Sequence, residues 1–219
     1  MTISPILNGP ETPEALTTGG DLGAYVLWTE PGHWGQAFYF EAPERFLGDQ
    51  EAMYGGSVHW SIKNIPSGSF ELADLVLIGG STVLANSLPP QATADWTRIS
   101  VRLIEAAGWE NSEAHRPANC GELREVLRNL SAVRIRGEFV SGLETAGLDS
   151  VWMMPPSPDI CSTDLDVDGS LGLGDLAILL SNFGASSGVS RCDGDITEDG
   201  QVSIADLALL LSVFGFPCQ

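Results

Sequence analysis

Two acidic segments in the last third of the chain carry the residue types that bind a cation. They run from Asp164 to Asp175 and from Asp195 to Asp206, so a shift of 31 residues (164 to 195) aligns them. Oxygen-bearing side chains stand at positions 1, 3, 5 and 12, with glycine at position 6, as in an EF-hand calcium loop. Calcium takes six to eight oxygen ligands at flexible distances, which this spacing supplies. The two segments therefore predict two bound Ca²⁺ ions.

Each loop position has an expected role in this coordination. Side chains at positions 1, 3, 5 and 12 and the backbone carbonyl at position 7 would surround the ion. The second loop has Thr197 where the first has Asp166, so we expect its site to bind calcium more weakly. The alternative, two solvated acidic turns that bind nothing, does not explain why both loops share one register. The predicted metal ligands are Asp164, Asp166, Asp168, Ser170 and Asp175, then Asp195, Thr197, Asp199, Gln201 and Asp206.

An apolar helix is expected after each loop, and none before it. Residues 155–158 and 186–190 are rich in proline or serine and favour helix poorly. Each repeat is thus a loop followed by a helix, with Asp rather than Glu at position 12. This arrangement resembles the type I dockerin over residues 161–219. The resemblance implies a small all-α extracellular module that binds a cohesin domain of a scaffold or cell-surface protein.

The two expected helices are apolar almost all round. A module of this size buries only a modest share of its surface, so part of each helix would meet a partner, unless the linker or the first domain covers it. Loop positions 10 and 11, often small and polar in familiar dockerins, are Leu173-Gly174 and Ile204-Ala205 here. The predicted partner-binding residues are Leu173, Leu176, Leu179, Leu180, Ile204, Leu207, Leu210 and Leu211.

The four cysteines are more consistent with disulfide bonds than with metal ligation, because no Cys-x-x-Cys pair occurs. Cys161, Cys192 and Cys218 lie at the edges of the acidic module. We prefer a Cys161–Cys218 disulfide, which would join the ends of the module and leave Cys120 as a buried free thiol. Bridges from Cys192 to either Cys161 or Cys218 remain alternatives.

The sequence of the first two thirds of the chain predicts several β-strands and one helix. Residues 97–103 and 133–139 alternate polar and apolar side chains, and residues 72–78 resemble a buried strand. Asn119 and Glu122 form a capping-box pattern ahead of an apolar helical face that ends at Leu130. This pattern predicts a mostly β antiparallel sandwich in residues 1–154 (core about 23–154). A proline-rich linker at 155–160 separates it from the module at 161–219.

The order of sequence motifs in this first part resembles that of the laminin B domain, also called laminin IV. The segment Phe38–Asp49 ends in Phe-Leu-Gly-Asp and precedes Tyr54-Gly-Gly, and the Ile-Arg strand within Leu130–Phe139 follows the helix. The resemblance implies a jelly-roll sandwich related in shape to carbohydrate-binding modules. It brings no catalytic residues.

Composition and charge argue against several classes of partner and of function. The net charge of −19 argues against nucleic acid and anionic membrane surfaces as partners, and residues 159–219 hold ten acidic residues against Arg191 alone. No apolar run could span a bilayer, and no signal peptide is visible at the N-terminus. His33, His59 and His115 are scattered, so no catalytic centre is expected.

The sequence thus predicts a non-catalytic extracellular or cell-surface protein. Its dockerin would anchor a recognition or structural domain to a cohesin in a calcium-dependent way. One alternative is a glycan-binding module that targets a scaffold to polysaccharide, and another is an unrecognised polysaccharide-active hydrolase. The aromatic residues that could stack on a sugar are Trp28, Trp34, Trp60, Tyr39 and Tyr54, although most of them could equally be core.

Overall fold

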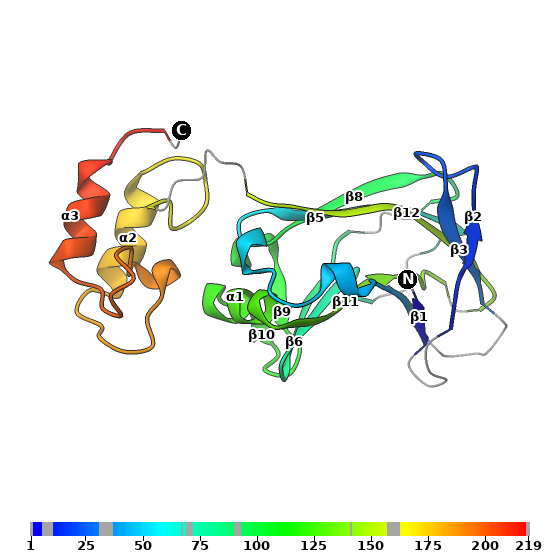
Figure 1. Cartoon of the computed structure of the whole chain (residues 1–219), viewed down its shortest axis with the longest axis horizontal. Coiled ribbons are helices and arrows are strands. Elements are labelled where there is room, and N and C mark those ends of the chain that lie inside the picture. Colours follow the sequence, from blue (N-terminus) through cyan, green and yellow to red (C-terminus); the bar gives the residue numbers. More distant parts are fainter. Residues whose placement is uncertain are drawn as a thin grey trace. The chain divides into compact units, whose positions relative to one another are not determined.

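The computed structural model divides the chain into two compact units, Met1–Pro155 and Pro156–Gln219, each of which is described by itself (Figure 1). Residues 2–5, 11–30, 37–66, 68, 72–89, 93–140, 142–156 and 163–217 are described. Trp34, His33, Cys161, Cys218 and linker residues 157–160 lie outside the described residues.

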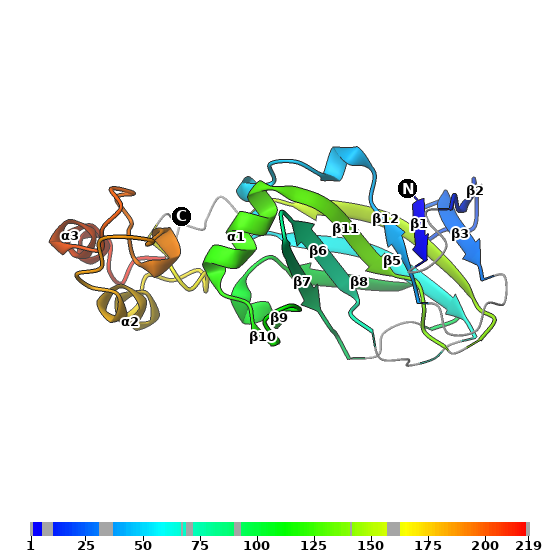
Figure 2. The same cartoon turned by 90° about the horizontal axis from the view of Figure 1, so that it is seen from below.

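The first unit is a sandwich of two antiparallel sheets (Figure 2). The larger sheet has the strand order β1-β4-β11-β6-β7-β9-β10, and the smaller has the order β2-β3-β12-β5-β8. The strands of the larger sheet are β1 (Thr2–Pro5), β4 (Phe38–Glu41), β6 (Leu75–Gly79), β7 (Thr82–Asn86), β9 (Trp109–Asn111), β10 (Arg116–Pro117) and β11 (Leu130–Arg136). Those of the smaller are β2 (Glu14–Leu16), β3 (Tyr25–Thr29), β5 (Ser57–Ile65), β8 (Thr97–Arg102) and β12 (Thr145–Met154).

One apolar core fills the space between the two sheets. Alternate residues of β5, namely Val58, Trp60 and Ile62, point inward and are almost fully buried. They join Phe38 and Leu77 of the opposite sheet in one cluster. This alternation is the reason that both sheets form, since each buries one face against the other. The prediction of a mostly β sandwich is confirmed.

A single α-helix packs on the larger sheet. Helix α1 (Cys120–Arg128) begins with the predicted capping box: the Asn119 side chain accepts from the Glu122 N–H at 2.9 Å, and Glu122 accepts from the Asn119 N–H at 3.0 Å. The prediction that Leu130 belongs to the helical face is wrong, because Leu130 begins β11. Short 3-10 turns complete this unit: η1 (Glu44–Phe46), η2 (Glu51–Met53) and η3 (Glu105–Ala107).

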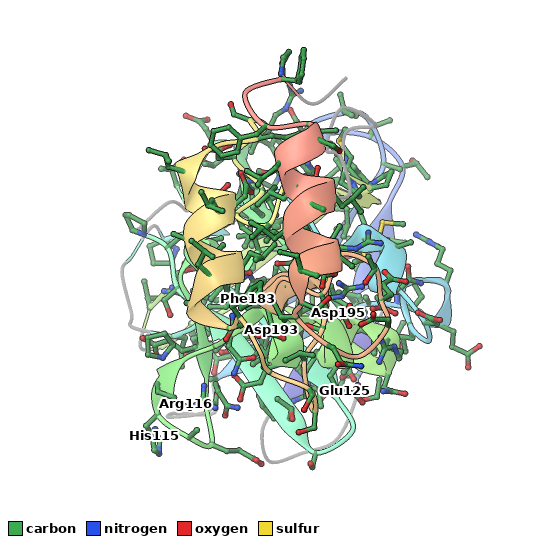
Figure 3. All side chains as sticks on the ribbon, turned by 90° about the vertical axis from the view of Figure 1, so that its left-hand side faces the viewer. His115, Arg116, Glu125, Phe183, Asp193 and Asp195 are labelled. Carbon is green, nitrogen blue, oxygen red and sulfur yellow. The ribbon has the colours of Figure 1, made fainter. Side chains whose placement is uncertain are left out.

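The second unit consists of two loop–helix repeats. Helices α2 (Leu173–Ser181) and α3 (Ile204–Ser212) lie side by side, and the short turn η4 (Arg191–Asp193) precedes the second loop (Figure 3). The small core of this unit contains residues at equivalent positions of the two repeats, 31 residues apart (179 to 210). Leu179 corresponds to Leu210, and Leu165 corresponds to Ile196. The repeat seen in the sequence is therefore also a repeat in structure.

Candidate metal centre

The first loop folds its carboxylates toward one point. The Asp164 carboxylate accepts hydrogen bonds from the backbone N–H groups of Asp168 (3.1 Å) and Gly169 (2.9 Å). Ligand oxygens of Asp164, Asp166 and Asp168 lie within 4.8 Å of one another. Two oxygens that each lie about 2.3–2.6 Å from one Ca²⁺ are at most about 5 Å apart, so this group fits a single ion.

Position 12 ties each loop to its helix. Asp175 is 1% exposed, and its carboxylate accepts from the N–H groups of Leu165 (2.6 Å) and Gly172 (2.7 Å). Asp206 is fully buried and accepts from the N–H groups of Thr197 (2.9 Å) and Ser203 (2.8 Å). A carboxylate offers about four lone-pair sites, so both residues keep capacity for a cation.

The second loop repeats these contacts with one substitution. Asp195 accepts from the N–H groups of Asp199 (3.0 Å) and Gly200 (2.9 Å), as Asp164 does in the first loop. At position 3 the hydroxyl of Thr197 donates to Asp206 at 2.9 Å instead of adding a carboxylate. At its ligand positions the second loop therefore offers one negative charge fewer than the first.

The backbone conformation also repeats. Val167 and Glu198, both at position 4, have φ of 57° and 58°, in the left-handed region that non-glycine residues rarely adopt. Gly169 and Gly200 at position 6 have φ of 90° and 85°. Position 7, occupied by Ser170 and Gln201, donates its N–H to the Asp at position 5 in both loops, at 2.7 and 3.0 Å. Two unrelated acidic turns would not share these features.

The two halves exchange backbone hydrogen bonds reciprocally. Leu171 in the first loop donates its N–H to the carbonyl of Phe216 (3.3 Å), and its own carbonyl accepts from the N–H of Gly215 (2.8 Å). Gly215 and Phe216 both follow the end of α3. The counterpart of Leu171, Val202, donates to the carbonyl of residue 185 (2.9 Å) and accepts from the N–H of residue 184 (2.8 Å), beyond α2. Each loop is thus held by the end of the other repeat, which is the contact pattern of a pseudo-two-fold arrangement.

Electrostatics in the first loop favour a bound cation. Burial, followed by the charges of Asp175 and Asp168, raises the pKa of Asp166 to about 6. Burial is also the main cause that raises the pKa of Asp164. In the second loop burial acts on Asp206 in the same direction, but hydrogen bonds from Thr197 and Ser203 outweigh it and lower its pKa. Burial and the neighbouring carboxylates thus disfavour the charged forms of Asp164 and Asp166, and a bound cation would offset this effect.

The predicted partner residues fall into two groups. Leu173, Leu176 and Leu180 are spaced along one side of α2, and we call them the α2 face; Ile204, Leu207 and Leu211 form the α3 face. Exposed fractions agree between the faces: 77% for Leu173 and 70% for Ile204, then 51% for Leu180 and 52% for Leu211. Leu176 and Leu207 are half-buried against the core. Both faces remain candidates for contact.

Leu179 and Leu210 do not belong to such a surface. Both are fully buried in the core between the two repeats, so the prediction that they contact a partner is wrong. The reason is that each helix is apolar almost all round, and the sequence period alone does not distinguish the inner side from the outer.

The cysteine prediction is corrected in part. Cys120 is disulfide-bonded, so it is not the free thiol expected from the sequence, and Cys192 is disulfide-bonded as well. Because Cys161 and Cys218 lie outside the described residues, the Cys161–Cys218 pairing stays a prediction.

Most of the aromatic residues considered for sugar stacking serve the sandwich core. Trp60 is 1% exposed, and Trp28 and Tyr54 pack against the core. Tyr39 is half-buried. An exposed aromatic of the sandwich that the sequence did not single out is Trp152, which is 38% exposed and stacks on His59 with ring centroids 5.3 Å apart.

Sequence reasoning also missed a buried acidic cluster inside the sandwich. Glu30, Glu138 and Glu144 are 6%, 4% and 2% exposed and belong to no motif. A weak signal was present, since Glu138 and Glu144 flank a short connection between two apolar strands.

No helix in the described part of the chain is long and apolar enough to cross a membrane. The larger unit is a two-sheet antiparallel sandwich. A family model for laminin B (domain IV) matches residues 39–159, more than half of the chain, and the chain belongs to this family. Its members are non-enzymatic structural domains, in agreement with the prediction that the chain is not an enzyme.

Similar proteins carry the same domain within much longer chains. The basement membrane-specific heparan sulfate proteoglycan core protein of Mus musculus is 25% identical over 160 residues, covering 69% of this chain and 4% of that protein. Laminin subunit gamma-2 of Equus caballus is 30% identical over 133 residues, covering 55% of this chain and 10% of that protein. This chain therefore spans no more than a tenth of the length of these two relatives.

A solved structure shows the same fold. The L4b domain of human laminin alpha-2 superposes with a TM-score of 0.58 at 14% identity, covering 70% of this chain and 90% of that domain. The family match confirms the predicted laminin B resemblance, and the solved structure shows the fold. The family match ends at residue 159, before the two loop–helix repeats.

Proposed function

We propose that residues 161–219 are a calcium-binding, dockerin-type module that anchors the laminin B domain to a cohesin-bearing scaffold or cell surface outside the cell. The observation that carries the proposal is the reciprocal repeat: two loops with matched hydrogen bonds, each opening a helix and each held by the end of the other. Calcium would fix the loops, and the loops would fix the orientation of the helices.

The side chains on the two exposed helix faces indicate which kind of partner surface they would contact. The α2 and α3 faces present leucine and isoleucine next to acidic loops, which suits a partner surface with an apolar centre. A panel of immobilised cohesin domains tests the proposal with the full-length chain. We expect retention on at least one cohesin in millimolar calcium and release in excess chelator. Absence of calcium-dependent retention across the panel would refute the anchoring role.

Calcium titration of the full-length chain should separate the two loops. We expect the second loop to bind about tenfold more weakly than the first, because Thr197 supplies no charge at position 3. Thr197→Asp should remove most of that difference. The reciprocal change Asp166→Thr should weaken the first loop by a similar factor and serves as the matched control. Calorimetry that detects no calcium binding at millimolar concentration would contradict the assignment of both loops.

A glycan-binding role for the sandwich is a second candidate. Its specific support is the exposed ring of Trp152 stacked on His59, because sugars bind against such flat aromatic surfaces. Glycan-array binding that is lost in Trp152→Ala would support this role. An array without binding would favour a structural role.

A further inference from the structure

Three glutamates are buried together at one end of the sandwich. Glu30 directly follows β3, Glu138 lies beyond β11, and Glu144 directly precedes β12; they are 6%, 4% and 2% exposed. Carboxylates are rarely buried to this degree unless they are paired or coordinate a metal. This cluster lies in the sandwich unit and shares no residue with the acidic loops.

Hydrogen bonds hold the three glutamates in contact. Glu30 donates its backbone N–H to the carbonyl of Glu144 at 2.9 Å. The Glu144 carboxylate accepts from the N–H of Phe139 at 3.0 and 3.1 Å and from the Asn64 side chain at 2.8 Å. The carboxyl groups of Glu138 and Glu144 also interact directly. The cluster therefore joins the ends of β3, β5, β11 and β12.

Negative charge in this region exceeds positive charge. Among the described residues, Arg136 is the cation that acts on Glu138. Its guanidinium also lies 3.3 Å from Asp74 and donates to the carbonyl of Glu138 at 2.7 Å. Arg136 thus acts on both Asp74 and Glu138. Burial is the main cause that raises the pKa of Glu138 to about 8, followed by the charges of Glu144 and Glu30.

Two buried oxygen atoms in the cluster have no hydrogen-bond partner. They are Asn64 Oδ1, on a fully buried side chain whose amide group already touches Glu144, and Glu138 Oε2. Buried polar atoms normally have a partner, and each exception calls for an explanation. Both atoms are hard oxygen donors, as are the carboxylates beside them.

We propose that Glu30, Glu138, Glu144 and Asn64 hold a calcium ion that stabilises this end of the laminin B sandwich. A divalent cation would offset the excess negative charge and give partners to both oxygens. The donors are carboxylate and amide oxygens in an irregular arrangement, which suits Ca²⁺ better than the strict octahedron of Mg²⁺. This ion is distinct from the two proposed for the acidic loops.

Binding requires a side-chain adjustment. Among the described residues, three ligand atoms of His, Cys, Asp or Glu lie within 4.8 Å of one another at Asp164, Asp166 and Asp168, and the glutamate cluster is more open. Glutamate has three rotatable side-chain bonds, and the proposed site requires a rotation of Glu30 or Glu138 toward Glu144. Mutual repulsion of the carboxylates favours the open arrangement without a cation.

The full-length chain allows the sandwich to be observed alone. All six tryptophans precede Pro155, so tryptophan fluorescence reports unfolding of the sandwich and not of the repeats. In wild type, calcium at about a hundred times its dissociation constant should raise the midpoint of this thermal transition by about 5 °C. The double variant Asp164→Ala/Asp195→Ala, which removes position 1 of both loops, should keep that shift.

Glu138→Gln keeps the side-chain shape and removes one ligand charge, so its calcium-induced shift should fall below about 1 °C. Without calcium its midpoint should not lie below that of wild type, because the amide replaces a carboxyl group of the same shape that is mostly protonated at neutral pH; this result also shows that the variant folds. Glu110→Gln, an exposed change in β9, is the matched control and should keep the full shift. No calcium-induced shift in wild type, or a full shift in Glu138→Gln, would overturn the proposal. Loss of the shift in the loop variant would do so as well.

Discussion

Chelation of calcium is expected to unfold the two loop–helix repeats while the laminin B sandwich stays folded at room temperature. The core of the repeats is small and centres on Leu179 and Leu210. In each loop a buried Asp at position 1 and another at position 12 share a confined space with further carboxylates. Without a cation these charges repel one another, and so small a core does not compensate for the repulsion. Metal binding and folding should therefore be coupled in this unit.

Two spectroscopic signals separate the units in the full-length chain. Helices α2 and α3 are two of the three α-helices in the described residues, so far-ultraviolet circular dichroism should lose most of its helical signal on chelation. Tryptophan fluorescence should still report a folded sandwich, since all six tryptophans precede Pro155. Asp164→Ala/Asp195→Ala should reproduce the helical loss in the presence of calcium. A helical signal that chelator leaves unchanged would show that the repeats fold without metal.

The sequence was sufficient for the loops because their geometry is local. Position 1 binds the N–H groups of positions 5 and 6, and position 12 binds the N–H of position 9, so spacing along the chain fixes every contact. The same holds for the capping box at Asn119. Alternation along β8 and β11 likewise sufficed to predict an antiparallel sandwich, because a period of two assigns one face to the core.

Non-local contacts were beyond the reach of sequence patterns. Helices that are apolar all round do not show which side faces the other repeat, so Leu179 and Leu180 could not be distinguished before the helices were seen side by side. The glutamate cluster was missed for a related reason. Glu30 and Glu144 are far apart in the sequence, and only the pairing of β3 with β12 brings them together.

The last prediction concerns how a cohesin would grip the proposed module. The α2 and α3 faces have matching residues and nearly equal exposure, and the reciprocal backbone bonds relate them by a pseudo-two-fold rotation. A partner that fits one face should therefore fit the other after about half a turn, giving two docking orientations. Differences such as Asn182 against Val213 would bias the choice between them without excluding either.

Substitution of one face or both distinguishes two orientations from one. If two modes contribute equally, Leu180→Asp or Leu211→Asp alone removes one mode and weakens cohesin binding by only about twofold. The double variant should weaken binding by about a hundredfold or more, because a charge then meets the apolar partner surface in either orientation. Each variant must retain calcium binding and helical signal; the neighbouring core residues Leu179 and Leu210 are avoided because their replacement would disrupt the fold itself. If Leu180→Asp abolishes binding while Leu211→Asp has no effect, or the reverse, a single face carries the interface and the dual orientation is wrong.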